Sequence, residues 1–121
     1  MMIGKLIATM FLSREITHRA HLSTNKYAHH MALGSFYDDI IDLADSLAEA
    51  YQGRHGIIDD IPMLQNDRPN SDIVKILEYH LAVIEKLRYT AIDKNDAPLQ
   101  AIADTIVELY LSTLYKLRQL K

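Results

Sequence analysis

GRHGIIDDIPMLQNDRPN, residues 53–70, is the stretch that decides the fold, because it is the longest break in the helical patterning of the chain. Glycine, proline, asparagine and aspartate punctuate it, which is typical of a connection between regular elements. Its apolar side chains should still be buried, namely Ile57, Ile58, Ile61, Met63 and Leu64. We therefore expect a packed crossover that contains a short helix.

On both sides of this stretch, apolar residues recur every three or four positions, which predicts two helices before it and two after it. The first helix is expected over residues 2–22. The second follows cap oxygens at residues 23–25 and stops near Gln52 and Gly53. The third is capped by Ser71 and runs to about Ala91, and the last has Pro98 in its first turn.

Two short connections around one long one predict an all-α four-helix bundle, ferritin-like in connectivity, with a crossover between its second and third helices. Four glycines and three prolines in 121 residues agree with long helices, and residues 1–121 are expected to form one domain. The last helix carries extra apolar residues outside its expected inner stripe, namely Val107, Tyr110, Leu111 and Leu114. A lone bundle would expose them, so we expect a partner surface there.

Composition narrows the function classes. A net charge of −3 offers no basic field for nucleic acid, and the absence of cysteine excludes disulfides and thiolate metal sites and suits a cytoplasmic protein. The apolar run near the N-terminus is broken by Gly4, Lys5 and Thr9, and is too short to span a membrane. We expect no membrane partner.

Histidines and carboxylates form the one pattern with chemical content. At 100° per residue, His30, Asp38, Asp45 and Glu49 fall on one stripe at the edge of the second helix's apolar face. His18 and His21 end the first helix and should lie near His30. Imidazole and oxygen ligands together suit iron, manganese or zinc.

One chain cannot bring this whole set to one metal ion, because His30 and Asp45 are separated by roughly 22 Å along a helix. Two copies can, if their second helices pack antiparallel about a two-fold axis. The alternative interpretation of Asp45 and Glu49 is an ordinary solvated face. His29 points away from the stripe, His55 has no evident partner, and His80 is expected to be a hydrogen-bonded core residue.

The spacing of His18, His30, Asp45 and Glu49 resembles that of the Dps-type miniferritins of the ferritin-like superfamily. In that family the second histidine follows the first by twelve residues, the aspartate comes fifteen later, and the glutamate four after that. The stretch ALGSFYDDIIDLADSLAEAYQG also resembles the family's second helix. More weakly, the chain is similar to short phage proteins of ferritin-like appearance, which would place it in a host cytoplasm.

The resemblance implies ferrous iron bound at a two-fold subunit interface, with oxidation there as a ferroxidase and storage in a hollow oligomer. The family usually carries an aspartate four residues after the second histidine and a tryptophan after the first, where this chain has Gly34 and Arg19. His21 and Asp38 are candidates to replace the lost ligand. The lysine-rich tail that some members use on DNA is missing, so no DNA binding is expected.

The sequence therefore supports two hypotheses. In the first, a homo-oligomer of at least two copies binds iron, or another divalent metal, through His18, His21, His30, Asp38, Asp45 and Glu49. In the second, the chain is a non-catalytic helical interaction module that keeps a ferritin-like scaffold without the chemistry.

Overall fold

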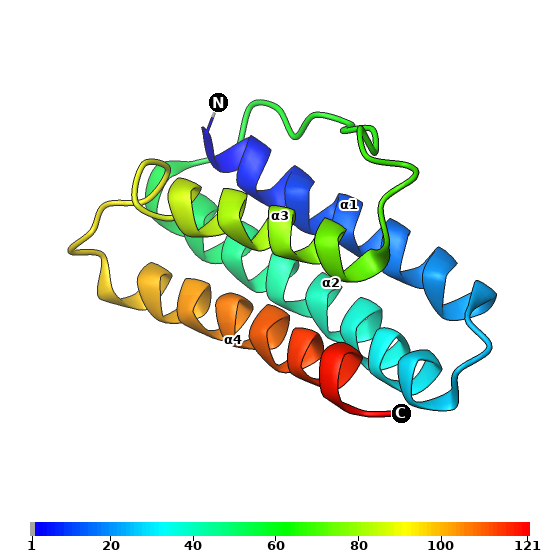
Figure 1. The fold of residues 1–121 in the computed structure, drawn as a ribbon. Helices are drawn as coiled ribbons and strands as arrows, with labels where there is room; N and C mark the ends of the chain where they lie inside the picture. The colour runs from blue at the N-terminus through cyan, green and yellow to red at the C-terminus, as the bar shows by residue number, and fades with distance from the viewer. Residues whose placement is uncertain (1) are drawn as a thin grey trace.

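The computed structural model describes residues 2–121, which form four α-helices and no strand. They are α1 (Met2–Ser23), α2 (Tyr27–His55), α3 (Ile73–Leu87) and α4 (Ala97–Gln119). The helices pack side by side, and a long connection returns the chain so that α2 and α3 run in the same direction, opposite to α1 and α4 (Figure 1). The predicted all-α four-helix bundle with a crossover between its second and third helices is confirmed.

The second helix is longer than predicted. It continues through Gly53 to His55, and Gly56 ends it with a φ of 88° while its N–H donates to the Gln52 carbonyl at 2.8 Å. Gly56 ends the helix because a positive φ costs glycine little, whereas Gly53 can remain helical. The expected cap oxygens at the start of α2 are also displaced: Thr24 Oγ1 accepts from the Lys26 N–H at 3.2 Å, within the turn.

The last two helices begin at aspartate caps. Asp72, not Ser71, accepts from the Lys75 N–H at 3.1 Å, and Asp96 accepts from the Leu99 N–H at 3.2 Å. α3 ends at Leu87 rather than near Ala91. The chain leaves the helix there because the buried Arg88 turns toward α4, where it bonds Gln100 and pairs with Asp104 at 2.6 Å.

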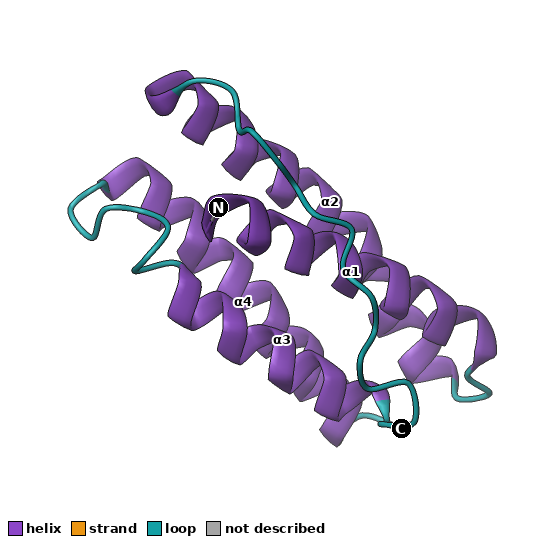
Figure 2. Ribbon diagram, turned by 90° about the horizontal axis from the view of Figure 1, so that it is seen from above, coloured by secondary structure: helices purple, strands orange, loops and turns teal. Residues whose placement is uncertain are grey.

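The crossover contains no helix, contrary to the prediction, and it runs over α1 (Figure 2). Its backbone rests directly on α1, because a Cβ at Gly4 would overlap the carbonyl oxygen of Asp60. Burial in the crossover is only partial. Ile58 is 7% exposed, whereas Ile57 and Met63 are 79% and 98% exposed. An extended chain on a helix presents alternate side chains to solvent, so it cannot bury all of its apolar residues.

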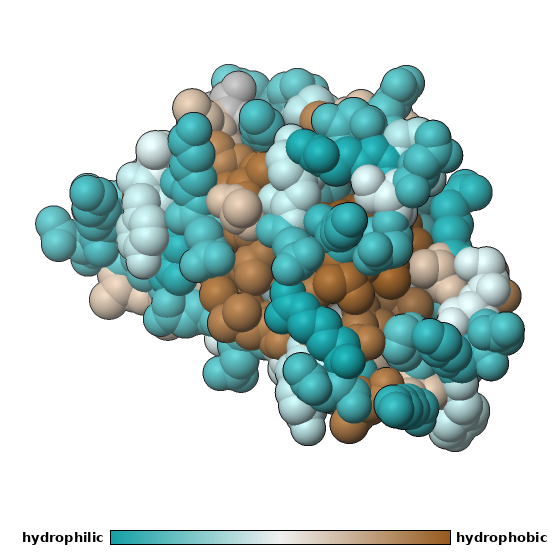
Figure 3. Space-filling view, viewed as in Figure 1, coloured by the Kyte–Doolittle hydropathy of each residue, from teal (hydrophilic) through white to brown (hydrophobic). Residues whose placement is uncertain are grey.

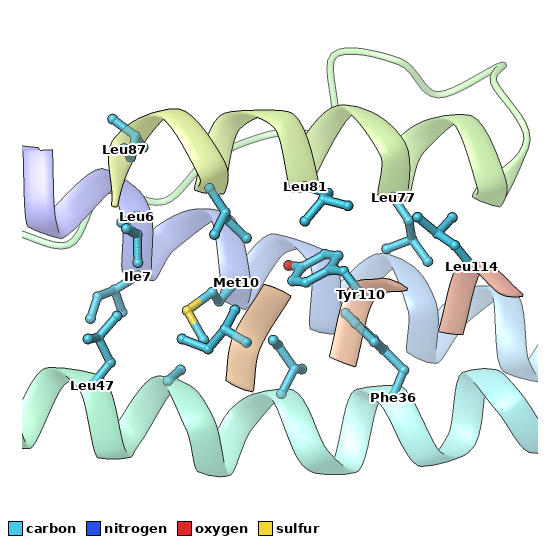
Figure 4. Close-up of a cluster of buried hydrophobic side chains, with 14 of the residues drawn as sticks. Leu6, Ile7, Met10, Phe36, Leu47, Leu77, Leu81, Leu87, Tyr110 and Leu114 are labelled. Carbon is cyan, nitrogen blue, oxygen red and sulfur yellow. The ribbon is translucent and has the colours of Figure 1, made fainter. Parts of the chain in front are cut away.

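All four helices contribute to one apolar core, shown in part in Figure 4. Phe36 of α2 and Tyr110 of α4 meet edge to face at its centre, with ring centroids 4.9 Å apart. Tyr110 and Leu114 are 0% and 2% exposed, so the prediction that they belong to an outer partner surface was wrong. The inner face of α4 is rotated from the expected one, because Leu120, expected inside, lies 43% exposed.

One polar chain crosses the core. Tyr110 donates to Ser13 Oγ at 2.7 Å, and Ser13 Oγ lies 2.6 Å from His80 Nδ1. His80 is 3% exposed, and burial lowers its pKa to about 4, an effect that the nearby Asp67 carboxylate partly opposes. His80 is thus the hydrogen-bonded core histidine that the sequence predicted.

Apolar side chains also reach the surface on the face formed by α3 and α4 (Figure 3). On α4, Leu111 and Tyr115 are 53% and 56% exposed. Within residues 2–121, no helix is long and apolar enough to cross a membrane.

Candidate metal site at the α1–α2 corner

Three of the predicted ligands come together where α1 turns into α2. The His21 and His30 rings stack with centroids 3.8 Å apart, and the His18 ring lies 6.4 Å from that of His21. His18 in turn stacks on Tyr37, with centroids 4.2 Å apart and planes 9° from parallel. The turn of residues 24–26 causes this arrangement, because it is short enough to hold the end of α1 against the start of α2.

His21 and His30 hold each other through their backbones. His21 Nδ1 lies 2.6 Å from the carbonyl oxygen of His30, and His30 Nδ1 lies 2.9 Å from that of His21. A carbonyl oxygen only accepts hydrogen bonds, so both Nδ1 atoms must carry the proton and donate. In the neutral rings, the lone pair is therefore on Nε2.

This arrangement matches that of metal-binding histidines, which usually donate one ring N–H to a carbonyl or carboxylate while the other nitrogen binds the metal. Both rings are partly buried, so their orientation is fixed without closing them off from solvent. The corner thus presents two oriented imidazole nitrogens.

Gly34 explains how His21 reaches this position. A Cβ at residue 34 would lie 3.0 Å from His21 Cε1 and 3.2 Å from its Nδ1, tighter than ordinary van der Waals contact. The His21 ring therefore covers the place where a side chain at position 34 would begin. At this position, where the resemblance led us to expect an aspartate, the structure has an imidazole.

Asp38 lies beside the histidines. A shallow surface depression of about 270 Å³ is lined by His21, His30, Met31, Gly34, Ser35, Tyr37 and Asp38. Asp38 is exposed, and it is the carboxylate nearest to hand for a cation held by these rings. Its placement agrees with the prediction that it belongs with the histidine corner.

Asp45 and Glu49 lie apart from the corner. Both are exposed on α2, one turn from each other, and the helix is continuous from Tyr27 to His55. The fifteen residues from His30 to Asp45 therefore span roughly 22 Å. Across residues 2–121, no group of three or more His, Asp or Glu side chains is arranged to hold a metal ion. One chain alone does not bring the predicted ligand set together.

Sequence reasoning missed two features of the corner. Tyr37 was treated as an ordinary core residue, yet it is the stacking partner of His18; its position seven residues after His30, on the same helix face, was the available signal. The second is a set of exposed apolar side chains around the histidines: Leu22, Tyr27 and Met31 are 72%, 76% and 51% exposed.

The remaining histidines are placed elsewhere. His29 is partly exposed on α2, and His55 stacks on Tyr51 near the end of α2, with ring centroids 4.5 Å apart. Neither lines the depression that holds His21 and His30.

Comparison with known families gives one match. The model of a family of unknown function (DUF5856) matches residues 21–117, which include the histidine corner from His21 onward and all of α2, α3 and most of α4. No curated protein and no solved structure matches the chain.

Proposed function

Because the chain belongs to the DUF5856 family, whose function is unknown, we propose its function from its own geometry. We propose that two copies bind ferrous iron at a shared interface, through the histidine corner of one copy and Asp45 and Glu49 of the other. Iron is the substrate of such a site, which resembles that of the Dps-type miniferritins. Zinc and manganese suit the same ligands.

The observation that carries this proposal is the reciprocal pair of hydrogen bonds between His21 and His30. Each ring donates Nδ1–H to the other residue's carbonyl, at 2.6 and 2.9 Å. A histidine that serves only as a surface residue has no need of a fixed tautomer, whereas a metal ligand gains affinity from one. Two neighbouring histidines held this way favour ligation over an incidental corner.

Carboxylates from a second copy would complete the ligand set. If two α2 helices pack antiparallel about a two-fold axis, the start of one lies beside the end of the other. Asp45 and Glu49 of one copy then approach His21, His30 and Asp38 of its partner, and the symmetry makes two such sites. The exposed Leu22, Tyr27 and Met31 would be covered in this interface, which supplies an apolar contribution to association.

The chemistry expected at this site is one-electron oxidation of ferrous iron. The carboxylates offset the charge that increases on oxidation, the imidazoles complete part of the coordination sphere, and open positions admit the oxidant.

The test is a double substitution, Asp45→Ala with Glu49→Ala, followed by absorbance measurement of ferrous-iron oxidation. We expect the catalysed rate to fall to that of buffer while the helical content is unchanged, because both side chains are exposed. Asp39→Ala with Asp42→Ala is the matched control, since it removes the same charge from exposed positions of the same helix. Equal oxidation rates in the two variants would refute the assignment.

The exposed apolar side chains also favour a second candidate, the non-catalytic interaction module. Leu22, Tyr27 and Met31 could serve a protein contact without any metal. Light scattering on the same samples separates the two candidates. An oligomer that leaves iron unoxidised and binds no divalent metal would support the interaction module.

A further inference from the structure

A groove lies between α1 and the crossover, on the side of the bundle away from the histidine corner's ligands. Its volume is about 500 Å³, and its lining is mostly apolar, from Ala8, Phe11 and Leu12 of α1 and Ile61 and Leu64 of the crossover. Pockets for small molecules usually measure about 300–1,000 Å³ and have such linings. Phe11, 39% exposed although the sequence places it inside, faces this groove rather than the core.

A second hollow of about 210 Å³ adjoins the groove, since Leu12 and Leu64 line both. Its lining is more polar and includes Lys5, Asp67 and His80. The two hollows together give an apolar channel with a polar end.

The tautomer of His80 is fixed by the chain of hydrogen bonds through the core. Burial raises the pKa of Tyr110 well above its usual range, so the phenol keeps its proton and donates it to Ser13 Oγ. The Ser13 hydroxyl then has its own proton to donate to His80 Nδ1, 2.6 Å away. His80 must therefore carry its proton on Nε2.

The Nε2–H of His80 is a donor whose ring is 3% exposed and lines the polar end of the channel. In residues 2–121, the one hydrogen bond of the His80 ring is that to Ser13. A buried donor left without a partner costs free energy, so this one favours an acceptor atom supplied by a bound molecule.

The charges at the polar end favour an uncharged group. Lys5 and Asp67 carry opposite charges there, and Glu15 lines the apolar groove. An anion would meet Asp67 and Glu15, and a cation would meet Lys5. A neutral acceptor meets neither cost.

We propose that this channel binds a small uncharged amphipathic molecule, with an acceptor oxygen on His80 Nε2–H and an aliphatic body between Leu12 and Leu64. The ligand class is that of neutral amides, alcohols and carbonyl compounds with a short alkyl chain. This site is separate from the histidine corner and does not depend on metal binding.

The test uses the full chain, labelled with ¹⁵N in its histidine rings, and octanamide as the probe. We expect the free protein to show His80 as the Nε2–H tautomer, and octanamide to shift that ring saturably together with the amides of Leu12 and Leu64. Leu12→Trp fills the channel and should weaken binding by at least about tenfold, or 1.4 kcal/mol. Leu111→Trp, a matched substitution at an exposed site on α4, should leave affinity unchanged.

Octanoate tests the choice of an uncharged head group, and it should bind more weakly than octanamide. Octanoate binding as tightly as octanamide or more tightly would overturn the assignment, as would an Nδ1–H tautomer of His80 or the absence of saturable shifts. Leu64→Trp, on the crossover, repeats the blocking test if Leu12→Trp does not fold. Unchanged affinity in a folded blocking variant would also overturn the proposal.

Discussion

His80 links the stability of the fold to pH. Its pKa is lowered from 6.5 to about 4 by burial, so between these values the unfolded chain binds a proton that the folded chain does not. Stability therefore falls as pH falls from 6.5 toward 4, and the loss due to this residue reaches about 3 kcal/mol. Urea unfolding at pH 7, 5.5 and 4.5 measures it.

The His80→Gln variant separates this contribution from those of other titrating groups. Glutamine can still accept from or donate to Ser13 but does not titrate, so the drop in unfolding free energy between pH 7 and 4.5 should be smaller by about 2–3 kcal/mol. Equal drops in the two proteins would show that His80 is not buried in its neutral form.

Gly34 and His21 should be energetically coupled, because the His21 ring lies over the position of a Gly34 Cβ. Glycine to alanine within a helix usually stabilises by about 1 kcal/mol. Here the added methyl group must displace His21 from its bond to the His30 carbonyl, which costs about 1 kcal/mol. Gly34→Ala should therefore leave the unfolding free energy nearly unchanged.

A double-mutant cycle measures this coupling. In a His21→Ala background the ring is gone, so adding Gly34→Ala should stabilise by about 1 kcal/mol. If Gly34→Ala stabilises the original chain by that same amount, the ring does not occupy this space.

Between elements, the contact of the crossover with α1 depends on Gly4. A Cβ at this position would overlap the Asp60 carbonyl, which is backbone and can move only if the crossover shifts. Gly4→Ala should lower the unfolding free energy by about 1–3 kcal/mol, as overpacking usually does. The control is Gly53→Ala in α2, where a Cβ meets nothing within 4 Å and should stabilise by about 0.5 kcal/mol. Two changes of equal sign would contradict the close contact.

The helices were predictable from sequence and the crossover was not, for a physical reason. Helical periodicity is local, so it identifies α1 to α4 without knowledge of their neighbours. The crossover's path depends on a contact between Gly4 and Asp60, which are far apart in the chain. Likewise, spacing predicted that His18, His21 and His30 meet, but the orientation of the rings depends on carbonyls whose positions only the turn fixes.

For the whole molecule, the proposed site has a consequence that a site within one chain does not share. One variant chain, His21→Ala with His30→Ala, lacks the imidazoles. Another, Asp45→Ala with Glu49→Ala, lacks the carboxylates. Each should be inactive alone. In a dimer of the two, the histidines of the second meet the carboxylates of the first, so one site of the pair is whole.

Equal amounts of the two variants, unfolded together and refolded, should regain about a quarter of the original iron-oxidising sites, since about half of the dimers are mixed and each holds one whole site of two. Oxidation followed by absorbance measures the recovery, and light scattering confirms that dimers or larger assemblies form. A matched mixture of the carboxylate variant with a chain carrying both pairs of substitutions should recover nothing. Recovery in that control, or its absence in the first mixture, would exclude a site built from the histidines of one copy and the carboxylates of another.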